Sequence, residues 1–535
     1  MITHHGVPMS LVSKGKLAGL IFLFLICIAC GDTYRPTIIP QPVPTPDPKN
    51  AHSTFTVNQN GTFNAGTGMQ VNVSGDSDAG VTKVAIMPVH ATLLGTRVWV
   101  ANQGADSVSA FSAAAGNSPI GSSVDINLAQ GAAPDFVESS ETSTMYVANS
   151  GNGTVNAING ITNAVTDTIP VGTHPIAMVE TPNNSSTTGL LKKLYVVNRD
   201  SSDVSVISSA DKSTIVTLPV GASPRWAAMR SDGARIYVLS HDAGTITIIN
   251  GLLPQDAIVP GGTISVGAGA EFLYYDSRRN RLYVPNPTNA TVGIFDASTD
   301  ALTRLATIDL KAAIPGGGAA PCPASGCVPV SVAALPDGTR AYIASYYLDT
   351  TSANCQQTSC VQVQVTVVDS LTNQVTKAIP LPEVSASPVA NCAAARFRIS
   401  AATAIDSSRV YVSSCDASGV WSINTSGDTY FATIPAPGSA YSPTLLNISA
   451  AAQNGTDTTY SYTYDPNSGT PIFLGLVVTI THMSAQADNG TFTVTGIGNG
   501  TFTVSNAAGT STAGETATGV GEPPRQNPVF ILTGS

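Results

Sequence analysis

Short apolar runs, each followed by a polar turn and a second apolar run, recur along most of the chain. In the stretch LYVVNRDSSDVSVI (194–207), the Tyr-Val-Val run favours a pleated, half-buried backbone until six polar residues interrupt it. Similar stretches occupy 98–111, 145–158, 236–249 and 282–295, and two divergent copies occupy 341–369 and 410–423. The chain is therefore expected to contain seven β-hairpins of one repeating type.

Each hairpin is the centre of a longer repeating unit. An apolar strand precedes it, as in 328–335, and an Asp-Gly turn of the kind that tight hairpins prefer joins the two. A further turn with Asn or Asp leads to a fourth strand, as in 213–221. Four antiparallel strands in a unit of about 40–50 residues are typical of a propeller blade. We therefore predict an all-β protein with a seven-bladed β-propeller over residues 81–436.

The repeated stretches resemble the YVTN β-propeller repeat of bacterial and archaeal surface proteins. The Tyr-Val strand, the polar turn, the V-x-V-[I/F] strand and the closing P-V-G-x-x-P recur in register. The resemblance implies a surface protein built on a propeller. YVTN repeats are also similar to the haem d1 propeller of nitrite reductases, but the chain has no C-x-x-C-H haem attachment site, so we expect no cofactor.

An asparagine ends the second strand of four units, at Asn102, Asn149, Asn198 and Asn286. Such side chains can hydrogen-bond their own downstream backbone and fix a turn. We interpret them as structural residues and not as catalytic groups.

Residues 437–535 follow a different pattern. Strands rich in alternating Thr and Val are expected at 457–464, 475–483, 490–498 and 500–509, with a last one at 528–534. This spacing predicts a small β-sandwich, and the segment resembles a bacterial Ig-like domain. The strand-like segment 53–80 is expected to pair either with the last blade or with this sandwich.

The first 52 residues indicate export. The apolar run 17–29 follows two lysines and is too short to span a membrane, so residues 1–29 read as a signal peptide. The segment before Cys30 resembles a bacterial lipobox, although Cys27 stands where that pattern has Leu. Residues 30–52 would then be a lipid anchor and a proline-rich linker that holds the protein at the cell envelope. The alternative is ordinary cleavage after Ala29.

Charge and cysteine content narrow the function. Charged residues make up 11% of the chain and the net charge is −10, with no basic patch of the kind that nucleic acid requires. Six cysteines follow Cys30, and an even number in an exported protein indicates disulfides. We predict the pairs Cys322–Cys327, Cys355–Cys360 and Cys392–Cys415. The alternative is that Cys355 or Cys360 is linked to Cys392 or Cys415. No histidine lies near them in sequence, so no metal site is expected.

The binding site of a propeller usually lies where the first strands begin and where the loops between second and third strands emerge. The residues expected near this channel mouth are Asp135, Phe136, Arg225, Trp226, Glu271, Phe272, Arg396 and Arg398, with Arg199 and His241 further out. The alternative is that Trp226 packs between blades and the charges form a solvated rim.

No hydrolase, zinc-protease or phosphate-loop motif occurs. We therefore expect a monomeric, non-enzymatic binding or scaffold protein that recognises an envelope protein or a polysaccharide through its propeller loops. The alternative is a lactonase or lyase with its site at the channel mouth.

Overall fold

The structure is a computed structural model that describes residues 53–113, 120–139, 144–182, 192–252, 256–352, 359–386, 392–438, 443–522 and 525–534. Cys30 and Cys355 lie outside these residues. The described part is all-β apart from three short 3-10 helices, at Gln103–Ala105, Cys392–Ala394 and Gln486–Asp488. It contains no helix long and apolar enough to cross a membrane.

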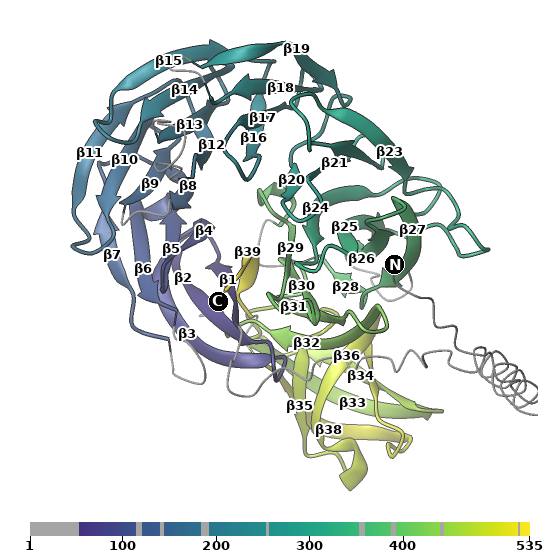
Figure 1. The fold of residues 1–535 in the computed structure, drawn as a ribbon. Helices are drawn as coiled ribbons and strands as arrows, with labels where there is room; N and C mark the ends of the chain where they lie inside the picture. The colour runs from purple at the N-terminus through teal and green to yellow at the C-terminus, as the bar shows by residue number, and fades with distance from the viewer. Residues whose placement is uncertain are drawn as a thin grey trace, which may run out of the picture. The chain divides into compact units, whose positions relative to one another are not determined.

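Eight antiparallel sheets of the described residues form the blades of a ring (Figure 1). The first four blades are β4 (Pro88–Leu94), β5 (Arg97–Asn102), β6 (Ser107–Ser112) and β7 (Val124–Asn127); β8 (Pro134–Ser139), β9 (Thr144–Asn149), β10 (Thr154–Asn159) and β11 (Val165–Pro170); β12 (Pro175–Glu180), β13 (Lys193–Asn198), β14 (Asp203–Ser208) and β15 (Thr214–Pro219); and β16 (Pro224–Met229), β17 (Arg235–Ser240), β18 (Thr245–Asn250) and β19 (Ala257–Ser265).

The next three blades complete the repeats that the sequence shows. They are β20 (Tyr274–Asp276), β21 (Arg281–Asn286), β22 (Thr291–Asp296) and β23 (Thr303–Asp309); β24 (Val328–Ala334), β25 (Arg340–Asp349), β26 (Cys360–Asp369) and β27 (Gln374–Pro380), with the short β28 (Val384–Ser385) beside β26; and β29 (Ile399–Thr403), β30 (Arg409–Ser414), β31 (Gly419–Asn424) and β32 (Thr429–Pro435). The long repeat that contains β25 and β26 is one blade with extended strands.

The prediction of seven blades is wrong, because the two ends of the described chain build an eighth. Its strands are β39 (Asn527–Thr533), β1 (Ser53–Asn60), β2 (Asn64–Asn72) and β3 (Ser77–Ile86), in that order from the axis outwards. In Figure 1 the yellow β39 lies beside the purple β1. Strand β39 also contacts β29 and β4, the first strands of the neighbouring blades. The ring is therefore closed by non-covalent pairing of the two ends, and the remaining free edges are those of the blades' outer strands.

The C-terminal segment is also arranged differently from the prediction. Strands β33 (Thr444–Asn454), β34 (Asp457–Tyr464), β35 (Val477–Thr481), β36 (Gly490–Gly498), β37 (Thr501–Ser505) and β38 (Thr512–Gly521) form a closed barrel and not a two-sheet sandwich. Both long strands, β33 and β38, change register within their pairing, which bends them enough to pair on both sides. The strand expected at 528–534 is absent from this domain because it belongs to the eighth blade.

The aromatic residue of each repeat lies in the core between blades. Trp99, Tyr146, Tyr195, Tyr237, Tyr283, Tyr342 and Tyr411 are all essentially buried. Their strands are buried on both faces, as the near-continuous apolar runs require when blades stack on each side. Burial of this apolar area is the main stabilising contribution to the ring.

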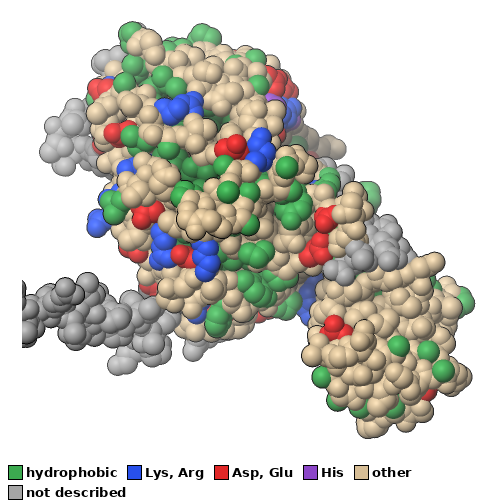
Figure 2. All heavy atoms as spheres, turned by 90° about the vertical axis from the view of Figure 1, so that its right-hand side faces the viewer, with side chains coloured by type: hydrophobic (Ala, Val, Ile, Leu, Met, Phe, Trp, Pro, Cys, Tyr) green, Lys and Arg blue, Asp and Glu red, His purple; other side chains and the backbone are tan. Residues whose placement is uncertain are grey.

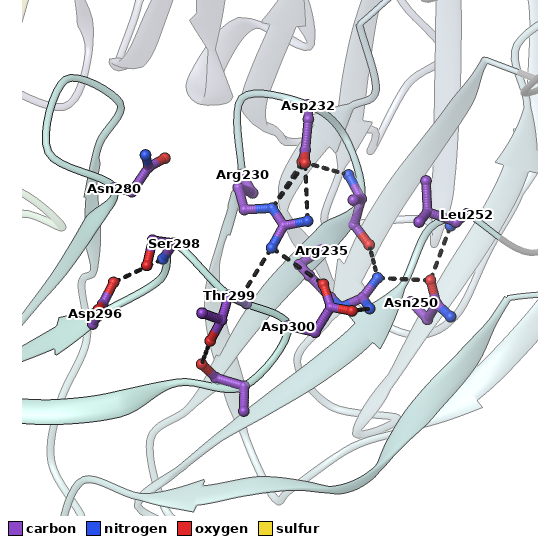
Figure 3. A network of polar contacts seen from close by, with 12 residues as sticks. Arg230, Asp232, Arg235, Asn250, Leu252, Asn280, Asp296, Ser298, Thr299 and Asp300 are labelled. Atoms are coloured by element: carbon purple, nitrogen blue, oxygen red, sulfur yellow. Dashed lines mark hydrogen bonds and ion pairs between the residues drawn. The ribbon is translucent and has the colours of Figure 1, made fainter. Parts of the chain in front are cut away.

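A basic residue two positions before the aromatic links neighbouring blades in six places. These residues are Arg97, Lys193, Arg235, Arg281, Arg340 and Arg409, and each contacts the turn between the third and fourth strands of the next blade. Figure 3 shows one such seam, in which Arg230 and Arg235 both bind the Asp300 carboxylate, at 3.3 and 2.6 Å. The same contact recurs at the eighth blade, where Arg409 binds Asp76 at 2.9 Å.

The repeated asparagines are structural, as predicted, but most act differently from the expectation. Asn286 does accept a hydrogen bond from the downstream Asn289 backbone N–H. The buried Asn102, Asn149 and Asn198 instead donate across the hairpin to side chains of the third strand.

Figure 2 shows a surface with scattered charges among many neutral polar groups, in keeping with the low charge content.

Two of the three expected disulfides are present, Cys322–Cys327 and Cys392–Cys415. Cys360 is also disulfide-bonded. Because Cys355 lies outside the described residues, its pairing with Cys360 stays a prediction. Disulfides of this kind are typical of proteins that fold in an oxidising compartment.

Candidate functional site

A cavity of about 840 Å³ opens at one end of the propeller axis. Its walls come from the starts of first strands and from loops between second and third strands of several blades. The side chains that matter below are Gln59, Phe63, Asn64, Gln103, Asp135, His174, Arg199, Arg225, Glu271 and Arg396. Four of them, Asp135, Arg225, Glu271 and Arg396, are among the residues expected near the channel mouth, and Arg199, which was expected further out, also lines the cavity.

A cluster of aromatic side chains from the innermost segments of the blades lies against Arg396, one of the lining residues of the cavity. Trp226 lies 5.6 Å from Phe136, 4.8 Å from Phe272 and 5.7 Å from Phe397, measured between ring centroids. Phe397 in turn contacts Phe530 of β39, and His90 stacks on Phe136 at 3.8 Å. Side chains from the first strands of different blades can meet only near the axis. The cluster therefore plugs the channel near the axis.

Arg396 covers this plug. Its guanidinium lies 5.3 Å from the Trp226 ring and 5.6 Å from the Phe136 ring, within the range of cation–π attraction. It also lies 3.6 Å from the Asp135 carboxylate and donates a hydrogen bond to the Ile176 carbonyl at 2.8 Å. Burial lowers the pKa of Arg396, and Asp135 opposes that effect. The charge of Arg396 is thus compensated within the site.

Arg199 and His174 form a second group on the wall. The Arg199 guanidinium pairs with Asp200 at 2.6 Å, and its Nη2 lies 3.1 Å from Nδ1 of His174. Burial, followed by the Arg199 charge, lowers the pKa of His174. A neutral His174 can accept the Arg199 N–H, so this arginine is also already partnered.

Arg225 is different, because its side chain has no polar partner in the described part of the chain. Its Nε is buried and makes no hydrogen bond, while only its backbone carbonyl is used, by Arg396. Glu271 lies in the same cavity with 54% of its side chain exposed, and its carboxylate lies 3.8 Å from the His241 imidazole. The cavity therefore offers one guanidinium without a polar partner among the described residues and one largely exposed carboxylate.

The structure separates the other sequence-predicted residues into three groups. Phe136, Trp226 and Phe272 belong to the plug, so Trp226 packs between blades, which was the alternative expectation for this residue. His241 binds Asp242 at 2.5 Å on the outer rim. Arg398 lies outside the cavity, where it binds the buried Asp416 at 2.7 Å.

Several cavity residues were missed by the sequence reasoning. Phe63, Gln59 and Asn64 lie at the turn between β1 and β2, in the blade that the repeats do not reveal. Phe63 is 87% exposed, the most exposed large apolar side chain among the described residues. A bulky aromatic between Asn60-Gly61 and Asn64, residue types that favour turns, was the signal that could have found it. His174 was not among the residues expected at the site.

Two further features bear on the chemistry of the site. The Cys392–Cys415 disulfide anchors the segment that carries Arg396. Ala393 and Ala395 of the same segment also line the cavity. Within the described ranges, no group of three or more His, Cys, Asp or Glu side chains is arranged to hold a metal ion.

Neither a family model nor a curated protein matches the chain. Solved structures share its propeller. Hydrazine synthase from Kuenenia stuttgartiensis is 16% identical, with 64% of this chain and 97% of that chain covered and a TM-score of 0.42. Dihydro-heme d1 dehydrogenase NirN, in complex with DHE, is 13% identical over 73% and 74%, with a TM-score of 0.49. AztD from Citrobacter koseri is 12% identical over 72% and 95%, with a TM-score of 0.46. At these identities and TM-scores the likenesses carry no argument about the activity.

Proposed function

We propose that this chain is a cell-envelope binding protein whose channel-mouth cavity recognises a group on a partner protein or glycan. The observation that carries the proposal is the unsatisfied Arg225 in a pre-formed cavity of about 840 Å³. The cavity combines apolar lining residues such as Met87, Val89 and Ile176 with a few convergent polar groups, which is the usual form of a ligand site. A guanidinium without a partner is costly to bury unless a ligand completes it.

The proposal includes the location. The apolar run 17–29, Cys30 and the proline-rich segment to residue 52 support an exported lipoprotein held away from a membrane surface. The YVTN-type stretches support a bacterial surface protein. In this scheme the barrel of residues 444–521 takes the place of the Ig-like module that the sequence resembles.

The experiment is a binding comparison on purified envelope fractions. The lipid-free protein from residue 31 is immobilised, and envelope proteins and polysaccharides are passed over it separately. Retained material should be lost when Arg225 is changed to Gln and kept when Arg278, an exposed arginine in the turn between β20 and β21, is changed to Gln. Equal retention by both variants would place the binding function elsewhere.

An enzyme is the second candidate, because Glu271 and His241 stand together beside the cavity. A carboxylate next to an imidazole can act as a general base in a lactonase or lyase. Turnover of lactones or acidic polysaccharides that Glu271→Gln abolishes, with binding retained, would favour this candidate over simple binding.

A further inference from the structure

We infer that the ligand of the cavity is a carboxylate-bearing sugar unit of an acidic polysaccharide. The inference rests on the proposed binding function and deepens it by naming the ligand class. Three features of the cavity carry it: one unpartnered guanidinium, one exposed aromatic ring at the rim, and a set of amide side chains.

The charge balance of the cavity fits a single negative charge. Arg199 is paired with Asp200 and Arg396 with Asp135, so Arg225 is the cation left over among the described lining residues. A planar guanidinium matches the two oxygens of a carboxylate. Glu271 in the same space disfavours a strongly charged ligand such as a phosphate dianion, which needs more than one free cation. A monoanion that keeps away from Glu271 is the better match.

Phe63 supplies a surface for a ring. It stands at the turn between β1 and β2, where Gly61 takes a positive φ of 67°, and it is 87% exposed while lining the cavity. An exposed aromatic at the edge of a concave site is typical of a binding residue, because it loses water contact only when a ligand covers it. The apolar C–H face of a sugar ring fits such a surface.

The remaining polar groups suit hydroxyls. Gln59 donates to the Pro88 carbonyl at 3.0 Å, which leaves its side-chain oxygen as an acceptor towards the cavity. Asn64 and Gln103 add two more amides to the lining. Amides offer both donors and acceptors, as a sugar hydroxyl requires, and Glu271 can accept from a hydroxyl as well. A sugar acid uses all of these groups together, whereas a simple carboxylic acid uses Arg225 alone.

The test uses a tetramer of galacturonic acid, its methyl ester, and oligomers of glucuronic and mannuronic acid beside neutral oligomers. Calorimetry on the protein from residue 31 measures the dissociation constants. We expect at least one acidic oligomer to bind at least about tenfold more tightly than its ester or neutral counterpart. Arg225→Gln should remove that preference, and the control Arg278→Gln should keep it.

The aromatic contribution is tested separately. Phe63→Ala should weaken the acidic oligomer about threefold to tenfold, whereas Ile161→Ala, a change at another exposed apolar residue, should have no effect. Both positions are exposed, so folding is not at risk, and circular dichroism verifies it.

The outcomes distinguish the inference from the proposed function. Equal binding of acid, ester and neutral oligomers, or an acidic peptide that alone binds through Arg225, would overturn the sugar acid but keep a binding cavity. If no saccharide or peptide binds and no cavity variant alters retention of envelope material, both the inference and the proposed function fail.

Discussion

The link between the seventh repeat and the eighth blade offers the sharpest test of the ring. Asp76, in the turn between β2 and β3, has only 3% of its side chain exposed. Its carboxylate accepts hydrogen bonds from Arg409 Nε at 2.9 Å, from Tyr411 Oη at 2.8 Å and from Ser422 Oγ at 2.5 Å. Asp76→Asn keeps the size of the side chain and tolerates the positive φ of 45° at this position.

The substitution removes the negative charge and leaves Arg409 partly buried without a counter-ion. Breaking one side of a buried ion pair costs about 3–5 kcal/mol. We expect a loss of about 3 kcal/mol in the free energy of unfolding, because the amide oxygen retains one acceptor. The assay is urea unfolding followed by the fluorescence of the buried Trp421 in β31.

The matched control is Asp78→Asn, which lies at the start of β3, two residues after Asp76. Asp78 is exposed and accepts only a local hydrogen bond from the Gly80 backbone. This variant should stay within about 0.5 kcal/mol of the unmodified protein. If Asp76→Asn and Asp78→Asn unfolded at the same urea concentration, the first strands of the chain would not be part of the ring, and the reasoning would be refuted.

Three further predictions concern stability, the site and the anchor. Burial raises the pKa of Glu138 to about 8. The contribution of this group to the free energy of unfolding is therefore fully present below the unfolded pKa of 4.5 and is lost as the pH rises through 8. Glu138→Gln should therefore raise the thermal midpoint at about pH 8.5 and leave it unchanged at about pH 4, and equal effects would contradict this. Replacing Cys392 and Cys415 by serine should destabilise the protein by about 3 kcal/mol. Calorimetry should also show weaker ligand binding in the cavity. Unchanged binding would mean that the loop holds Arg396 in place without the disulfide. Mass spectrometry of membrane-extracted protein should find diacylglyceryl on Cys30, and an unmodified mature terminus in the soluble fraction would exclude the lipoprotein.

The repeat could be predicted because its information is local. The run of Tyr195, Val196 and Val197 specifies a strand wherever it stands, and a regular return of the same run specifies blades. The disulfides Cys322–Cys327 and Cys392–Cys415 followed from loops on one face of such blades. The positions of Asp135, Arg225 and Glu271 at the channel mouth followed in the same way, because the start of each first strand faces the axis.

The sequence by itself thus determined the all-β propeller, its disulfide loops and half of the candidate site. Only the tertiary structure decided the eighth blade, because β39 and β1 pair across almost the whole chain and neither carries the repeat motif. It also decided that Arg398 faces Asp416 and that Phe63 reaches the cavity. A local pattern records what a residue prefers, but which distant strands pair and which charges meet depends on the whole ring closing, since long-range contacts form only when all blades are in place.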